Sequence, residues 1–160
     1  MKVIFLDIDG VLNIIPKTHD RFGGTFHEHL VKNLKTIVDK TEAKIVISST
    51  RRHSGLKIMQ EMWQERNLPG EVIDVTIDLG MHQDDDGFWQ SEKRGDEIKI
   101  WVDKNKPNSY VIIDDDTDML PDQMRNFVQT SGNINHPDCI DIGYGLTEIC
   151  SEKAIRILNG

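Results

Sequence analysis

Two aspartates stand one residue apart directly after an apolar run near the start of the chain. The run 3–6 predicts a buried strand, and Asp7 and Asp9 follow it, just before Gly10. Carboxylates at the end of a buried strand lose hydration and repel each other, so they do not stabilise the fold by themselves. Their types and spacing indicate a site for a hard cation, which prefers oxygen ligands.

Two further polar groups follow apolar runs in the same way. The run 43–47 is followed by the hydroxyl-bearing and basic stretch 48–52, and the run 109–113 is followed by three acids, 114–116. In a parallel sheet, ligands bind at the carboxyl ends of the strands, where the chain leaves for the next helix. We therefore expect all three polar groups to meet at one edge of a sheet.

Apolar periodicity along the chain predicts five strands that alternate with helices. The strands are expected at 2–7, 43–50, 71–77, 109–114 and 125–130, and the helices at 28–40, 55–66, 95–105 and 147–160. Thr147 is expected to cap the last helix. This alternation predicts an α/β, Rossmann-like fold of three layers, with a mostly parallel five-stranded sheet covered on both faces.

These motifs resemble those of the haloacid dehalogenase-like (HAD) phosphohydrolase superfamily, in the same order and at the same strand ends. DIDGVLN, residues 7–13, is similar to the D-x-D-G motif of that family, and IVISST, 45–50, to its second motif. VIIDDDTD, 111–118, is similar to the motif with paired acids. The resemblance implies a HAD-type fold for a single domain, residues 1–160.

The resemblance also implies a chemistry for the acidic residues. Asp7 is expected to be a nucleophile that forms an aspartyl-phosphate, and Asp9 a general acid and base. Mg²⁺ is expected between Asp7 and Asp114, with Asp115 bound directly or one shell out and the backbone carbonyl of Asp9 completing the set. Mn²⁺ satisfies the same oxygens. An acid at Asp9 favours phosphatase chemistry over dehalogenation or ion pumping.

The phosphate group is expected to be held by hydroxyl and cationic side chains. Ser49, with Thr50 beside it, ends the second motif of the resemblance. The family also has a lone Lys or Arg at the start of a helix, which Lys93 or Arg94 matches. Arg94 is favoured because a helix start is expected directly after it, and Lys93 remains the alternative.

The two intervals in which HAD proteins carry cap domains are short here. A flap is expected at about 14–26 and a loop at about 78–92, so the cap is minimal and the site open enough for a polynucleotide end. VISSTRR and KRGDEIKIW resemble small HAD domains of nucleic-acid repair proteins, which act as end phosphatases. No kinase P-loop or ligase segment accompanies them. A nucleotide or small-metabolite phosphatase is the alternative, and a non-catalytic phosphate-binding module is the alternative of another class.

The amino-acid composition limits the kinds of molecule that the protein is expected to bind. The chain has 27 acidic and 19 basic residues and a formal net charge of −8, so an extended basic track for nucleic acid is not expected. Two cysteines and no long apolar segment predict a cytoplasmic protein without a membrane span. No obligate protein partner is evident; the expected partner is a phosphorylated substrate.

Several aromatic residues and one pair of histidines allow more than one interpretation. Trp63 and Trp101 lie on apolar helical stripes, which predicts core packing. Phe88 and Trp89 are expected to plug their loop onto the body, and the alternative is that they stack on a base. The HEH stretch, 27–29, is expected to be a solvated helix start rather than a metal site.

Overall fold

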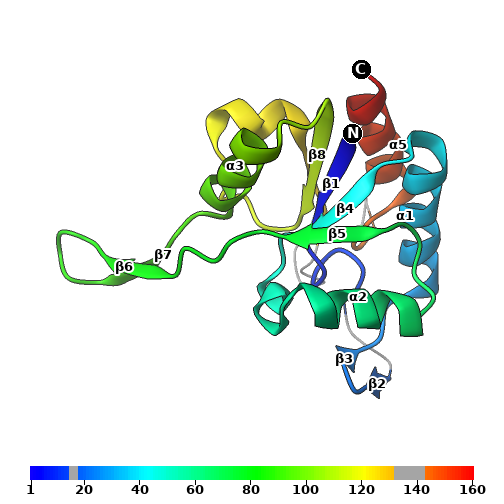
Figure 1. The fold of residues 1–160 in the computed structure, drawn as a ribbon, viewed down its shortest axis with the longest axis horizontal. Coiled ribbons are helices and arrows are strands. Elements are labelled where there is room, and N and C mark those ends of the chain that lie inside the picture. Colours follow the sequence, from blue (N-terminus) through cyan, green and yellow to red (C-terminus); the bar gives the residue numbers. More distant parts are fainter. Residues whose placement is uncertain (15–17, 132–142) are drawn as a thin grey trace.

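A five-stranded sheet lies at the centre of the computed structural model, which describes residues 1–14, 18–131 and 143–160 (Figure 1). The strands lie in the order β5, β4, β1, β8, β9, and every neighbouring pair is parallel. They are β1 (Lys2–Leu6), β4 (Lys44–Ile47), β5 (Val72–Val75), β8 (Ser109–Asp114) and β9 (Phe127–Gln129). The predicted α/β, Rossmann-like fold is confirmed, with the sheet fully parallel.

Helices cover both faces of the sheet because both faces of its central strand are apolar. Ile4 and Leu6 of β1 point into one core cluster, and Val3 and Phe5 point into the other. The first cluster packs against α1 (Glu28–Thr41), α2 (Leu56–Glu65) and α5 (Glu148–Asn159), and the second against α3 (Arg94–Asn105). Figure 1 shows α1 and α5 on one side of the sheet and α3 on the other. No helix in the described residues is long and apolar enough to cross a membrane.

Several local predictions are confirmed. Trp63 and Trp101 are buried, and the Trp101 ring packs edge-on against Phe5 at 5.3 Å between centroids. The Thr147 hydroxyl accepts a hydrogen bond from the Cys150 backbone N–H at 3.2 Å, so it caps α5. Cys150 is a free thiol, whereas Cys139 lies outside the described residues.

Two hairpins were not predicted. The expected flap, 14–26, contains β2 (His19–Asp20) and β3 (Gly23–Gly24), although residues 15–17 lie outside the described chain. The expected loop, 78–92, contains β6 (Met81–Gln83) and β7 (Trp89–Ser91), which form a hairpin that projects away from the sheet (Figure 1). The division of the chain into one domain with these two insertions stays a prediction. Two short 3₁₀ helices, η1 (Thr50–Ser54) and η2 (Pro121–Asn126), were also missed.

The interpretation of Phe88 and Trp89 as a plug was wrong. Their side chains are 68% and 63% exposed, respectively. The hydrogen bonds that stabilise the turn lie within the hairpin itself. The Asp84 carboxylate accepts them from the backbone N–H groups of Asp86 and Phe88, at 3.1 and 2.8 Å. The turn therefore needs no contact with the body, and both aromatic rings face solvent.

Candidate active site

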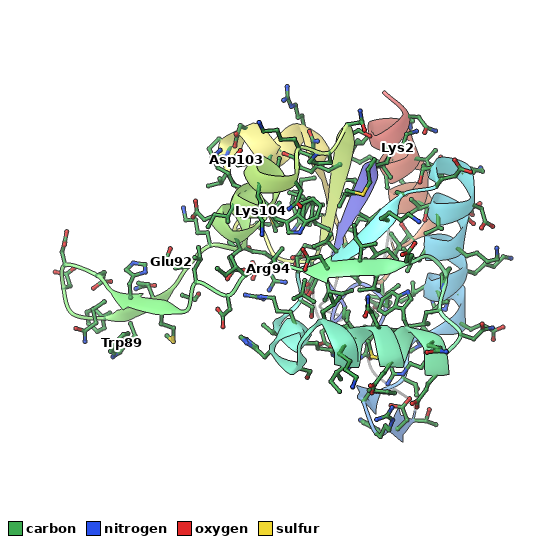
Figure 2. The ribbon with its side chains drawn as sticks, viewed as in Figure 1. Lys2, Trp89, Glu92, Arg94, Asp103 and Lys104 are labelled. Carbon is green, nitrogen blue, oxygen red and sulfur yellow. The ribbon has the colours of Figure 1, made fainter. Side chains whose placement is uncertain are left out.

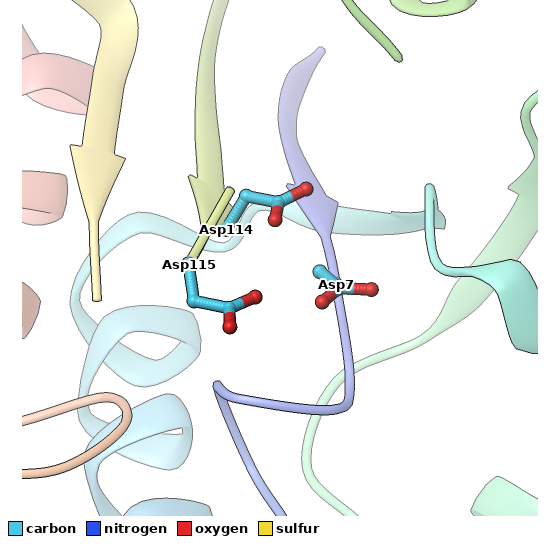
Figure 3. A group of neighbouring side chains, drawn as sticks. All are labelled: Asp7, Asp114 and Asp115. Carbon is cyan, nitrogen blue, oxygen red and sulfur yellow. The ribbon is translucent and has the colours of Figure 1, made fainter. Parts of the chain in front are cut away.

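Asp7 and Asp114 lie at the carboxyl ends of neighbouring strands, at the same edge of the sheet. Leu6 of β1 lies beside Ile113 of β8 in the parallel ladder, and the Asp7 N–H donates to the Ile113 carbonyl at 3.0 Å. One carboxylate oxygen from each of Asp7, Asp114 and Asp115 lies within 4.8 Å of the other two (Figure 3). The structure thus brings together three carboxylates from two segments more than 100 residues apart.

Burial makes the negative charge of this cluster costly. It raises the pKa of Asp114 to about 8, with the charge of Asp7 adding to the shift. It raises the pKa of Asp115 to about 6, again with a contribution from Asp7. The pKa of Asp7 is raised for the same reason, although the positive charge of Arg94 acts against the shift. Burial therefore disfavours simultaneous ionisation of the three groups, and a cation among them would favour it.

The Arg94 guanidinium places a positive charge of the protein itself beside the carboxylates of Asp7 and Asp114. Its Nη1 lies 3.1 Å from Asp7 Oδ1 and its Nε lies 3.3 Å from Asp114 Oδ2, and the guanidinium also donates to the Ser48 carbonyl. Arg94 is the first residue of α3, and its backbone N–H donates to Asp118 Oδ2 at 2.9 Å. Lys93, one residue earlier, is exposed. The structure places Arg94 in the cluster and Lys93 outside it.

Ser49 and Thr50 follow β4, on the other side of Asp7. Ser49 is fully buried, and a hydrogen bond from its side chain lowers the pKa of Asp7. Its hydroxyl also accepts from the Arg51 N–H at 3.4 Å as η1 begins. Thr50 is exposed and lines a cavity together with Arg94. The Ser49 hydroxyl is therefore beside the carboxylate of Asp7, and Thr50 lies at the mouth of the site.

Asp9 lies outside the group of three clustered carboxylates. Its side chain is 52% exposed and pairs with Arg51, whose Nε and Nη2 lie 2.9 and 2.7 Å from its two oxygens. Asn13 donates a further hydrogen bond at 3.0 Å. The chain turns directly after Asp9 at Gly10, which has φ +83° and where a Cβ would lie 2.3 Å from the Asp115 carboxylate. A ligand role for the Asp9 carbonyl stays a prediction.

Sequence reasoning assigned no role to two arginines that the structure places at the site. Arg51 joins Asp9 to the first hairpin, because its Nη1 donates to the Phe22 carbonyl at 3.3 Å. Arg52 is buried and makes two hydrogen bonds to Glu97 of α3, at 2.7 and 2.8 Å, while it donates to the Ser49 carbonyl at 3.0 Å. Their position directly after a buried strand was the available signal. Together they fix the segment that carries Ser49.

A cavity of about 480 Å³ opens beside the carboxylate cluster. Thr50 and Arg94 line it near the strand ends, and Met81 and Ser91 line it at the base of the projecting hairpin. Asp116 and Asp118 add negative charge to its wall. The cavity thus runs from Arg94, beside the carboxylate cluster, to the base of the β6–β7 hairpin.

The donor set fits Mg²⁺. All three neighbouring carboxylates offer hard oxygens, and Asp114 Oδ2 is buried without a hydrogen-bond partner, although Arg94 lies near it. A divalent ion among Asp7, Asp114 and Asp115 would offset the charge that burial disfavours. The buried cluster is therefore compatible with the magnesium that HAD proteins generally use.

Without a divalent cation, the free energy of unfolding should fall as the pH rises from about 5 to about 8. The folded pKa values of Asp115 and Asp114, about 6 and about 8, exceed the ordinary value of 3.8, so the folded state binds more protons than the unfolded state. The stability that these groups contribute is present at low pH and is lost as the pH rises through their folded values. Added Mg²⁺ should raise stability most at pH 8, where it meets ionised ligands.

Urea unfolding at pH 5 to 8, with Mg²⁺ or with a chelator, measures this effect. Asp114→Asn removes the carboxyl group whose pKa is raised to about 8 and should flatten the profile recorded in chelator. A parent profile in chelator that rises between pH 5 and 8 would contradict the assigned environment of the cluster.

Comparison with known proteins places the chain in a family. The model of the family described as the HAD domain in Swiss Army Knife RNA repair proteins matches residues 3–135. The match runs from β1 to beyond β9 and so includes every strand of the sheet and the whole carboxylate cluster. A comparison with curated proteins gave no match. The chain belongs to the family of HAD domains in Swiss Army Knife RNA repair proteins.

Proposed function

We propose that this protein is a Mg²⁺-dependent phosphomonoester hydrolase that acts through an aspartyl-phosphate on Asp7. The observation that carries the proposal is the buried group Asp7, Asp114 and Asp115, with Arg94 in contact with the first two. Such a group is costly for folding, and it matches what a phosphoryl transfer needs: an anionic nucleophile, a metal site and a fixed positive charge.

The residues around Asp7 hold the phosphoryl group. Ser49 and Thr50 donate hydroxyl groups to its oxygens, and Arg94 neutralises the negative charge that moves onto them. Asp7, Asp114 and Asp115 would hold Mg²⁺, which would offset the negative charges of the nucleophile and the substrate. Arg94 is the proposed third-motif residue because it contacts Asp7, whereas Lys93 is exposed.

The reaction has two displacements at phosphorus. A carboxylate oxygen of Asp7 attacks, the ester P–O bond breaks, and Asp9 gives a proton to the departing alkoxide. Asp9 then takes a proton from water, whose oxygen attacks the phosphorus, and the new bond replaces the acyl phosphate bond, which frees Asp7 and inorganic phosphate. Because Arg51 holds the Asp9 carboxylate here, proton transfer requires that side chain to turn toward the leaving group.

The proposed substrate is a phosphorylated nucleic-acid end. The family description names RNA repair proteins, and the cavity beside Arg94 continues to an exposed hairpin instead of closing under a cap. A nucleotide or small-metabolite phosphatase is the second candidate, which the net charge of −8 and the cavity of about 480 Å³ favour. The predicted cytoplasmic location belongs to this proposal as well.

The test is phosphate release from a chromogenic phosphate ester, from 3′- and 5′-phosphorylated oligonucleotides and from mononucleotides. Release should require Mg²⁺, stop when a chelator is added and return with excess Mg²⁺ or Mn²⁺. An oligonucleotide should be the better substrate by kcat/KM. A strong preference for mononucleotides would favour the second candidate, and tight phosphate binding without turnover would indicate a non-catalytic module.

A further inference from the structure

Exposed apolar side chains concentrate on the β6–β7 hairpin and the segment that leads to it. Half of the ten large apolar side chains that are exposed in the described residues lie within 77–89. They are Ile77, Leu79, Met81, Phe88 and Trp89. A concentration of this kind on a projecting element indicates a binding surface rather than scattered surface residues. Figure 2 shows Trp89 on this hairpin, well outside the body of the fold.

The two faces of the hairpin differ in their relation to the active site. Met81 pairs with Ser91 and Gln83 pairs with Trp89, so these four side chains share one face. Phe88, one residue before Trp89 and bonded through its carbonyl to the Asp84 N–H at 2.9 Å, points to the other face. We call the first of these the Trp89 face.

The Trp89 face continues the cavity that contains Arg94. Met81 and Ser91 line that cavity, and Trp89 is two residues beyond Ser91 on β7, about 7 Å along the strand. A substrate whose terminal phosphate lies at Arg94 and Asp7 therefore meets Met81 first and Trp89 next as it leaves the site.

Charge decides which part of a nucleic acid can lie on this face. The exposed acids Asp85 and Asp86 occupy the hairpin turn, and Asp116 and Asp118 line the cavity. These groups repel backbone phosphates, whereas an exposed indole ring and a thioether favour the flat faces of bases. The surface suits unpaired bases next to one phosphate, and not a duplex gripped along its backbone.

We infer that the Trp89 face of the β6–β7 hairpin stacks on the unpaired bases next to the terminal phosphate of a single-stranded RNA substrate. This inference rests on the proposed phosphatase function and deepens it. It also accounts for how an acidic protein can select a nucleic-acid end, since stacking needs no basic track. Substrate affinity should therefore depend only weakly on salt concentration.

Steady-state kinetics of the parent, Trp89→Ala and Phe88→Ala test the inference. The substrates are a terminally phosphorylated RNA trinucleotide, in 3′ and 5′ forms, its abasic counterpart and p-nitrophenyl phosphate. Trp89→Ala should raise KM for the trinucleotide about tenfold, the scale of one lost base–aromatic stack, and leave kcat for p-nitrophenyl phosphate unchanged. It should not change KM for the abasic counterpart.

Phe88→Ala is the matched control, because it removes a similarly exposed aromatic ring that directly precedes Trp89 and that side-chain alternation assigns to the opposite face of the hairpin. It should leave every KM unchanged. Equal effects of the two variants, no effect of Trp89→Ala on the trinucleotide, or an equal loss with p-nitrophenyl phosphate would each overturn the inference. A dimer in sedimentation that Trp89→Ala dissociates without a change in KM would also overturn it, in favour of a contact between copies.

A binding measurement separates this inference from the proposed chemistry. Trp89 is the exposed one of the three tryptophans, whereas Trp63 and Trp101 are buried. In an Asp7→Asn background the phosphorylated trinucleotide should quench tryptophan fluorescence, and Trp89→Phe should remove the quenching. Quenching without hydrolysis by the parent would reject the phosphatase and support the stacking surface. Hydrolysis by the parent without quenching would support the phosphatase and reject the stacking surface.

Discussion

Replacing Asp7 with Asn should abolish phosphate release and leave the protein folded. Asn keeps the shape of Asp but lacks the anionic oxygen that attacks phosphorus, so the turnover rate should fall by about 10⁴-fold or more, the scale seen when a nucleophile is removed. Because burial raises the pKa of Asp7, the charge itself opposes folding. The variant should therefore be at least as stable as the parent at pH 7 without metal.

The measurement is release from a chromogenic phosphate ester with saturating Mg²⁺, together with urea unfolding in chelator. Asp116→Asn is a matched control, because Asp116 is exposed and is not among the three clustered carboxylates. It should retain most of the activity. Equal release by Asp7→Asn and the parent would eliminate Asp7 as the nucleophile.

Replacing Arg94 with Gln should reduce both activity and stability. The guanidinium lies 3.1 Å from an Asp7 oxygen and 3.3 Å from an Asp114 oxygen, so its loss leaves two buried carboxylates without their cation. The kcat/KM for a phosphate ester should fall by about 10²- to 10³-fold, as for the loss of a charge that stabilises a transition state. Mg²⁺ should restore much of the stability, because it neutralises the same carboxylates, but not the activity.

Lys93→Gln distinguishes the two candidates for the third motif. Lys93 precedes α3 and is exposed, so this variant should keep the activity and unfolding free energy of the parent. We expect the two variants to differ because Arg94 contacts Asp7, whereas Lys93, its neighbour in the sequence, is exposed. A larger loss of activity in Lys93→Gln than in Arg94→Gln would reverse the assignment.

The position of the carboxylate cluster could be predicted from the sequence because it follows from topology. Parallel strands that alternate with helices leave their carboxyl ends at one edge, so Asp7 and Asp114 had to meet once β1 and β8 were neighbours. The same rule placed Ser49 beside them. The roles of these residues in catalysis are predictions that the variants above test.

The partners of long side chains could not be predicted in the same way. Arg51 holds Asp9, and Arg52 holds Glu97 across 45 residues of sequence, and neither pairing leaves a periodic signal. The projecting hairpin was missed because its two strands have only three residues each, and its turn is stabilised by Asp84 rather than by the core. Because the turn is stabilised within the hairpin, Trp89 does not pack against the body of the protein and is exposed.

A crystal structure with Mg²⁺ and beryllium trifluoride, a mimic of a phosphoryl group on a carboxylate, tests the central claim most directly. The account predicts one cation coordinated by oxygens of Asp7 and Asp114, with beryllium bonded to an Asp7 carboxylate oxygen and its fluorines contacted by Ser49 and Arg94. Beryllium bound to any other residue, or a cation that does not touch Asp7 and Asp114, would contradict it.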